Sequence, residues 1–291
     1  MQQILAVVEG NESDLGVIGR AKMMAAHTGG EVSLFMSVYD PVEELNRYVG
    51  FDNYAEVKEA VMEDAEIKLR HLAEREGETL NSNMVWGRRW HLNVLTEAKN
   101  IGAELIVKAV GKHSRIAEFL QTPEDWHLLR EAECPVWMVN GDTSQIDKVA
   151  ASFSVLDETA EHRLLGSRVV DMARQMAWAL KVPLEVVTVI PDLNSSQAAA
   201  SRVPLLLGDV QARARARAEK LLADELERLG ISPDCAVVLE GHPHMALADA
   251  AGCSGLLVIG SVAHRGISGK LIGNTSEKVL HHLAGDVVVV H

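Results

Sequence analysis

The stretch that decides the fold is LLVIGSVAHRGISGKLIGNTSEKVLHHL, which runs from Leu256 to Leu283. It opens with an apolar segment typical of a buried strand and closes with a helix pattern, in which Asn274 is expected as the N-cap and Glu277 completes a capping box. A glycine-rich loop that ends on a helix N-terminus lets backbone amides approach an anion, so the stretch predicts a phosphate-binding loop. An ordinary glycine-rich surface loop before a capped helix fits the same pattern. The glycines between the two segments are Gly260, Gly266, Gly269 and Gly273.

A related segment lies one half-chain earlier. Laying Lys108 on Gly260 aligns the two segments without a gap and superimposes apolar positions throughout. The matched pairs include Val110 with Val262, Leu128 with Leu280, and Val136 with Val288. Two copies of one supersecondary unit explain this agreement.

Both halves alternate short β-branched runs with longer helical stretches, which predicts parallel strands joined by right-handed crossovers. The expected fold class is therefore α/β, with two tandem doubly wound five-stranded parallel-sheet domains over residues 1–141 and 147–291. The polar, turn-rich segment GDTSQID at Gly141–Asp147 is the expected linker. The expected strands are Ile4–Val8, Val32–Val38, Met84–Trp86, Leu105–Val107, Val136–Val139, Val149–Ala151, Leu184–Ile190, Ala236–Leu239, Leu256–Ile259 and Val287–Val290.

Each half also contains a long helix with an apolar stripe at spacings of three and four, expected to face the core. The two stripes are Val57, Val61, Ala65, Leu69 and Leu72 in the first half, and Val210, Ala214, Ala218, Leu222 and Leu229 in the second.

The composition argues against several classes of function. A formal net charge of −13 over 291 residues repels nucleic acid and anionic lipid, so neither is an expected partner. No segment approaches the roughly 20 apolar residues that span a bilayer, and no basic leader precedes the first strand. Three cysteines at unrelated spacings suggest free thiols in a reducing compartment, so a cytoplasmic location is expected.

The loop resembles the C-terminal signature of the universal stress protein family, G-x2-G-x9-G-[ST]. Gly260 and Gly273 match the first and third glycines, while Ala263 replaces the second and Asn274 replaces the Ser or Thr. The whole chain, taken as two copies, resembles the tandem, E-type subgroup, through GNTSE at Gly273–Glu277 and, in the first half, TPEDWHLLR and CPVWMV. The resemblance implies a Rossmann-like, adenine nucleotide alpha hydrolase-like fold, with ATP as the ligand of nucleotide-binding members. The implied contact residues are Gly260, Ser261, Gly266, Gly273, Asn274 and Thr275.

The first half departs further from the signature. Lys108 and Gln121 stand at the positions of Gly260 and Gly273, and Gly111 is the remaining glycine. Glu124 and Asp125 fill the first turn of the following helix, where carboxylates would compete with a phosphate. No nucleotide site is therefore expected there.

The resemblance also implies an Asp at the end of the first strand, which contacts the nucleoside. Glu9 stands near that position in the first half, and Ser152 or Phe153 stands there in the second. Each half therefore lacks part of the family site.

No nucleophile–base set or metal-ligand spacing is evident, and the positions of His242, His244, His281 and His282 do not form a helical ligand pair. We therefore expect no catalytic residues and no metal cluster. The leading hypothesis is a non-enzymatic stress-response protein that binds ATP or a related nucleotide weakly in its second half. A slow ATPase or phosphotransferase has the least support.

The alternative is a binding or scaffold module for an apolar small ligand or a protein. Apolar residues in the insertions Asp40–Asp52 and Pro191–Asp209 would line its site, unless they cover the sheet ends or the seam between domains. The two halves are expected to form an intramolecular pseudo-dimer through Val136–Val139 and Val287–Val290, because these apolar strand edges would otherwise invite uncontrolled pairing.

Overall fold

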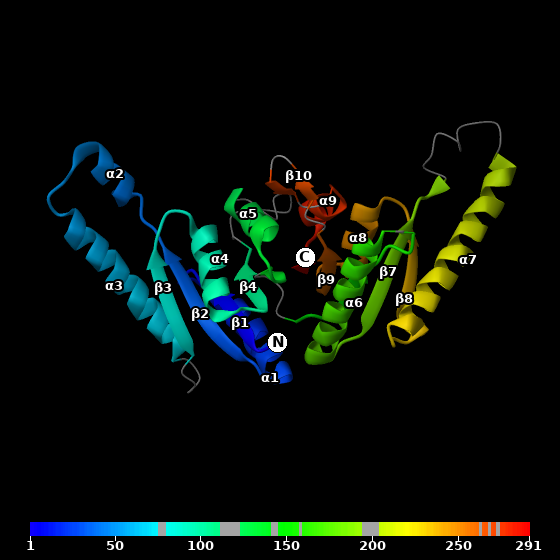
Figure 1. Cartoon of the computed structure of the whole chain (residues 1–291), viewed down its shortest axis with the longest axis horizontal. Coiled ribbons are helices and arrows are strands. Elements are labelled where there is room, and N and C mark those ends of the chain that lie inside the picture. Colours follow the sequence, from blue (N-terminus) through cyan, green and yellow to red (C-terminus); the bar gives the residue numbers. More distant parts are fainter. Residues whose placement is uncertain are drawn as a thin grey trace. The chain divides into compact units, whose positions relative to one another are not determined.

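The structure is a computed structural model that describes residues 1–74, 80–110, 123–140, 145–156, 159–193, 204–261, 264–266, 269–271 and 274–291. The described residues fall into two compact units, unit 1 up to residue 140 and unit 2 from residue 145 (Figure 1). Each unit contains a five-stranded parallel sheet with flanking helices, which confirms the expected α/β class.

Unit 1 has the sheet order β3-β2-β1-β4-β5. All its described strand pairs are parallel, with Ile4 opposite Val32 on one side of β1 and opposite Leu105 on the other. Its elements are β1 (Gln3–Val7), α1 (Asp14–Thr28), β2 (Glu31–Val38), α2 (Val42–Val49), α3 (Tyr54–Ala73), β3 (Asn81–Trp86), α4 (Trp90–Ile101), β4 (Leu105–Ala109), α5 (Pro123–Glu131) and β5 (Val136–Val139).

Unit 2 has the order β8-β7-β6-β9-β12, the same topology as unit 1. Val149 of its central strand lies opposite Leu184 on one side and Leu256 on the other. Its elements are β6 (Lys148–Ser152), α6 (Ala160–Leu180), β7 (Leu184–Ile190), α7 (Pro204–Arg228), a short 3-10 turn (Pro233–Cys235), β8 (Ala236–Glu240), α8 (Pro243–Ala251), β9 (Gly255–Gly260), β10 (His264–Gly266), β11 (Gly269–Leu271), α9 (Asn274–His282) and β12 (Asp286–Val290).

Every expected strand overlaps an observed one. The short antiparallel hairpin of β10 and β11, which pairs His264 with Leu271, is an additional element that the sequence pattern did not predict. The hairpin follows β9 within the stretch Leu256–Leu283, so the loop between β9 and α9 contains regular structure of its own.

Local signals explain where several helices begin and end. Thr159 caps α6, because its Oγ1 accepts a hydrogen bond of 3.2 Å from the backbone N–H of His162. Helix α4 ends at Gly102, whose φ of 65° lies in the left-handed region that glycine adopts without strain. Helix α5 begins at Pro123, as the pattern predicts.

The two long helices bury only part of their expected stripes. In α3 the buried residues are Ala65, Leu69 and Ala73, while Val57 is exposed. In α7, Ala218, Leu222 and Leu226 are buried, whereas Val210 and Ala214 are exposed and Leu229 lies beyond the end of the helix. The expectation that Val57, Val210 and Ala214 face the core is therefore wrong.

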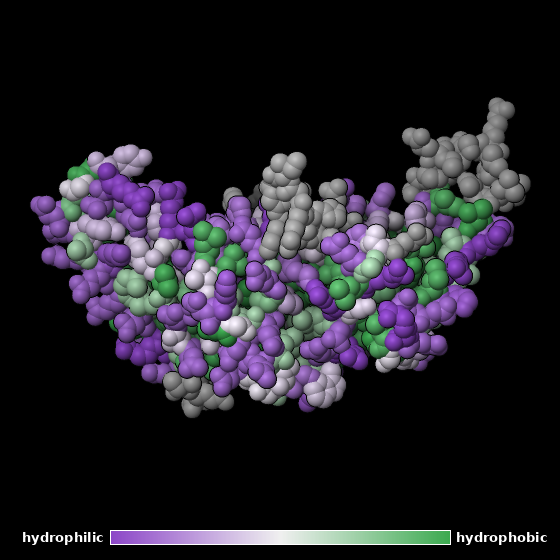
Figure 2. Space-filling view, in the orientation of Figure 1, coloured by the Kyte–Doolittle hydropathy of each residue, from purple (hydrophilic) through white to green (hydrophobic). Residues whose placement is uncertain are grey.

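The physical reason is length. At about 1.5 Å per residue, α3 and α7 outrun the strands beside them, so their N-terminal turns extend past the sheet edge. Helix α3 as a whole contacts α2 as well as the strands β2 and β3. The surface over α3 is mostly hydrophilic in Figure 2, as expected for a helix that buries one narrow stripe.

The insertion after β2 forms helix α2, and its apolar residues are not part of the core. Leu45, Tyr48 and Val49 are 60%, 87% and 73% exposed. The corresponding insertion in unit 2 lies largely outside the described residues. Within the described part of the chain, no helix is long and apolar enough to cross a membrane.

Candidate functional site

The predicted phosphate loop begins where β9 ends in unit 2. Gly260 is the last residue of the strand, and Ser261 follows it, buried, with its backbone N–H bonded to the carbonyl of Val290 at 2.8 Å. A Cβ on Gly260 would lie 2.8 Å from both Cγ and Cδ2 of Leu165 in helix α6. Close packing of α6 on the strand therefore requires a glycine at this position whether or not a ligand binds.

The end of β9 is tied directly to helix α9. The Ser276 hydroxyl donates a 2.8 Å hydrogen bond to the carbonyl oxygen of Gly260, and Ser276 is in the first turn of α9. This bond holds the helix N-terminus, with its partial positive charge, close to the carboxyl end of the sheet.

Other predicted contact residues are placed only in part. Gly266 is in β10, and the backbones of Asn274 and Thr275 form the start of α9. Gly273, and the side chains of Asn274 and Thr275, lie outside the described part of the structure, so the expected N-cap of Asn274 stays a prediction.

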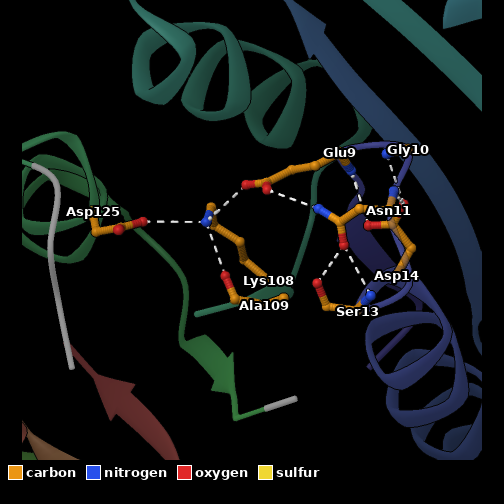
Figure 3. A network of polar contacts seen from close by, with 8 residues as sticks. All are labelled: Glu9, Gly10, Asn11, Ser13, Asp14, Lys108, Ala109 and Asp125. Carbon is orange, nitrogen blue, oxygen red and sulfur yellow. Dashed lines mark hydrogen bonds and ion pairs between the residues drawn. The ribbon is translucent and has the colours of Figure 1, made fainter. Parts of the chain in front are cut away.

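In unit 1 the matching position holds a buried ion-pair network (Figure 3). The Lys108 ammonium, at the end of β4, lies 3.2 Å from Glu9 Oε1 and 3.3 Å from Asp125 Oδ1, and it donates a 2.9 Å hydrogen bond to the carbonyl of Ala109. The ring centroid of Trp90 is 4.8 Å from Nζ. The cation therefore occupies the space between the end of β1, the end of β4 and the start of α5.

The electrostatics of this network are self-contained. Burial lowers the pKa of Lys108, but the carboxylates of Asp125 and Glu9 raise it by more, so the pKa of this ammonium lies above its ordinary value. Asp125 is in the first turn of α5, where its carboxylate also complements the helix dipole. The Lys108 ammonium and the N-terminus of α5 could each attract a phosphate, but each already has a carboxylate of the protein beside it.

The backbone N–H groups that follow β1 also donate to a carboxylate of the protein. The Asp14 carboxylate accepts hydrogen bonds of 2.9, 2.7 and 2.9 Å from the backbone N–H groups of Glu9, Gly10 and Asn11. The Asn11 side-chain oxygen in turn accepts a bond from the backbone N–H of Ser13 (Figure 3). The sequence pattern did not indicate the Lys108–Asp125 pair, because that contact joins separate elements. It did not indicate the role of Asp14 either, because these local bonds depend on the conformation of the loop after β1.

The position after the first strand of unit 2 has no acidic residue. Phe153, which follows β6, is 8% exposed, and its ring lies against Gly166 of α6, where an added Cβ would be 2.8 Å from Cε2. Phe153 is therefore packed against α6, whereas Glu9 of unit 1 is paired with Lys108.

Histidines pair between equivalent helices in the two units, α4 with α5 in unit 1 and α8 with α9 in unit 2. In unit 1, His91 of α4 stacks on His127 of α5 at 5.0 Å, and Glu131 completes a group whose ligand atoms all lie within 4.8 Å of one another. In unit 2, His244 of α8 lies 5.3 Å from His282 of α9, measured between ring centroids. The spacing of His127 and Glu131, four residues apart on one helix, is the sequence signal that could have identified the first group.

Comparisons with known proteins agree with this fold. The family model described as "Universal stress protein family" matches residues 1–140 and 165–291. The chain belongs to the universal stress protein family. Among curated proteins, this universal stress protein is 26% identical to "Universal stress protein E" of Escherichia coli K12, over 99% of the chain and 93% of the relative.

Solved structures resemble the universal stress protein over its full length. A Pseudomonas aeruginosa UCBPP-PA14 protein described as a universal stress protein superimposes with a TM-score of 0.71 at 26% identity, covering 100% of this chain and 93% of that one. A universal stress protein from Archaeoglobus fulgidus shares the fold at 16% identity, with a TM-score of 0.65 and coverage of 99% and 97%. The tandem arrangement is therefore found in other members of the family.

Proposed function

We propose that this universal stress protein is a non-enzymatic stress-response protein that binds ATP or a related nucleotide weakly, in unit 2 only. The observation that carries the proposal is the contrast between Gly260 and Lys108. In unit 1 a buried ammonium and the Asp125 carboxylate fill the junction between the fourth strand and the following helix. In unit 2 the same junction has Gly260 in place of the lysine, and the uncharged Ser276 hydroxyl donates a hydrogen bond to the carbonyl of Gly260.

Charge supports the same assignment. The α5 N-terminus has Glu124 and Asp125 in its first turn, and the amides after β1 are bound by Asp14. The first turn of α9 has a single carboxylate, Glu277. An incoming phosphate would therefore meet less repulsion in unit 2 than in unit 1.

Two departures from the family signature favour weak binding. If Ala263 must adopt positive φ, its methyl group costs about 1 kcal/mol, which lowers affinity roughly fivefold to tenfold. Ser152 or Phe153 stands where the family's acid would contact the nucleoside. For these reasons we expect binding that requires high nucleotide concentrations.

Calorimetry on the full chain tests the proposal. Titration with ATP should give saturable heat, Gly273→Val should remove it, and Gly111→Val should leave it unchanged as the matched control in unit 1. No heat at about 1 mM ATP from a folded protein would overturn the proposal. A phosphate-release assay on the same samples should stay at background, since we propose no catalytic residues.

A second candidate function is a binding or scaffold module for an apolar small ligand or a protein. The observation that favours it is the exposed apolar face of α2, formed by Leu45, Tyr48 and Val49. Mass spectrometry of molecules retained by gently purified protein tests it, with Tyr48→Ser as the variant that should lose a ligand held at α2. Retention that is equal in both samples would contradict this candidate.

We further propose a cytoplasmic location, which the three free thiols Cys134, Cys235 and Cys253 support. The domain limits 1–141 and 147–291, and the pairing of the halves through Val136–Val139 and Val287–Val290, stay predictions. Cross-links between the two strands' flanking residues, identified by mass spectrometry at low protein concentration, would test the pairing, and cross-links formed only between chains would contradict it.

A further inference from the structure

The facing surfaces of α4 and α5 in unit 1 contain a group of nitrogen and oxygen ligands that the nucleotide proposal does not use. His91 is in the first turn of α4, and His127 and Glu131 are one turn apart on α5. Their ligand atoms lie within 4.8 Å of one another. We propose that His91, His127 and Glu131 bind a divalent transition-metal ion of the zinc class.

One edge of the coordination polyhedron is already formed. Nδ1 of His127 and Oε1 of Glu131 are 3.2 Å apart. Ligand atoms about 2.0–2.1 Å from a tetrahedral zinc ion are separated by about 3.3–3.4 Å, so this pair needs almost no rearrangement. The helix fixes the spacing, because residues four apart lie on the same face.

His91 supplies a buried ligand without a partner. Its side chain is 9% exposed, and Nδ1 is buried with no hydrogen-bond partner in the described structure. The nearest carboxylate oxygen is Oε2 of Glu124, 3.9 Å away and too far for a hydrogen bond, and that oxygen is also buried without one. A buried imidazole nitrogen and a buried carboxylate oxygen, neither with a hydrogen bond, are costly unless a proton or a cation lies between them.

The exposed ligands must move a little before all three ligand atoms can meet at one position. The rings of His91 and His127 are nearly parallel, at 20°, so their lone pairs do not point at one position. The side chains of His127 and Glu131 are 47% and 40% exposed, which leaves room for the pair to turn together toward the buried His91. A preformed buried ligand and an adjustable exposed one can therefore converge on the same ion.

The ligand types select the class of metal. Two imidazole nitrogens with a carboxylate suit Zn²⁺ and its neighbours in the transition series, whereas Ca²⁺ and Mg²⁺ prefer oxygen ligands throughout. Glu131 in the group, and Glu124 beside His91, supply negative charge that offsets the charge of a divalent ion. This proposal departs from the sequence-based expectation of no metal.

Unit 2 provides a matched control within the same chain. His244 and His282 lie on the equivalent helices α8 and α9, with rings 5.3 Å apart. Among the side chains that the structure describes, no group of three ligand atoms meets around that pair at the spacing found in unit 1. Among the described side chains, the His244–His282 pair thus has no counterpart of the Glu131 carboxylate at that spacing.

Calorimetric titration of the full chain with zinc chloride, in a Cys253→Ser background that removes the exposed thiol, tests the site. We expect one ion per chain, with Kd at least tenfold weaker in His127→Gln and in Glu131→Gln and within twofold of the parent in His244→Gln. Glu131→Gln is an isosteric change at a partly exposed side chain, so circular dichroism should show an unchanged fold. Wild-type affinity in both unit 1 variants, loss of the site in His244→Gln, or no binding at about 1 mM zinc would overturn the proposal.

Discussion

The ammonium nitrogen of Lys108 lies 3.3 Å from Oδ1 of Asp125, and each side chain is only 4% exposed. Removing one member of a buried ion pair leaves an uncompensated charge in the low-dielectric interior of the protein. We therefore expect Lys108→Met to lower the free energy of unfolding of unit 1 by about 3–5 kcal/mol.

Urea denaturation followed by tryptophan fluorescence measures this effect, because four of the five tryptophans belong to unit 1: Trp86, Trp90, Trp126 and Trp137. The double variant Lys108→Met/Asp125→Asn should recover part of the loss. Equal destabilisation in the single and double variants would show that the pair is not coupled.

A second prediction concerns Gly260. An added Cβ would meet Cγ and Cδ2 of Leu165 at 2.8 Å, so Gly260→Ala should destabilise unit 2 by about 1–3 kcal/mol through overpacking. The companion change Leu165→Ala removes the side chain that the new Cβ would contact. The double variant should therefore lose less stability than the sum of the losses in the two single variants.

Gly19→Ala in α1 is the matched control for Gly260→Ala, because its Cβ would meet nothing within 4 Å. A helix-interior glycine replaced by alanine should stabilise the protein by about 0.5–1 kcal/mol. Urea titration monitored by circular dichroism compares the two. If Gly260→Ala is as stable as the parent, the close packing of α6 on β9 is wrong.

The cysteines should differ in reactivity. Burial raises the pKa of the Cys134 thiol to about 11, so roughly one thiol in a thousand is ionised at pH 8. Cys253 is exposed. Timed alkylation with iodoacetamide at pH 8, followed by peptide mass spectrometry, should modify Cys253 long before Cys134. Equal rates at the two sites would contradict the raised pKa of Cys134.

The stability of unit 2 should depend on pH through His244. Burial, and then the charges of His282, Lys278 and His242, lower the pKa of His244 below its ordinary value of 6.5. As the pH falls through 6.5, His244 binds a proton in the unfolded chain before it does so in the folded one. The free energy of unfolding of unit 2 therefore decreases until the pH falls below the pKa of His244 in the folded state.

NMR titration of the imidazole measures the His244 pKa directly, and melting temperatures between about pH 5 and 8 measure its consequence. His282→Gln should bring the pKa of His244 back toward 6.5, since it removes one neighbouring charge. A pKa at or above 6.5 in the wild-type protein would contradict the interpretation.

Much of the fold could be predicted from the sequence because it depends on local pattern. Apolar runs such as Val136–Val139 and Val287–Val290 are fully buried strands, as their composition indicates. The alignment of Lys108 with Gly260 likewise places two structurally equivalent positions, each near the end of the fourth strand of its unit. Periodicity also identified both long helices, but it could not show that Val57 and Val210 lie beyond the sheet edge.

The candidate site was predictable in outline and not in its chemistry. Sequence alone determined the strand, the loop and the helix, since glycine, capping and β-branched residues act on the backbone next to them. Only the tertiary structure decided that Gly260 makes room for Leu165, that Lys108 is held by Glu9 and Asp125, and that His91 faces His127. These contacts join residues far apart in the chain, and their energies depend on burial and distance, which exist only once the elements have packed.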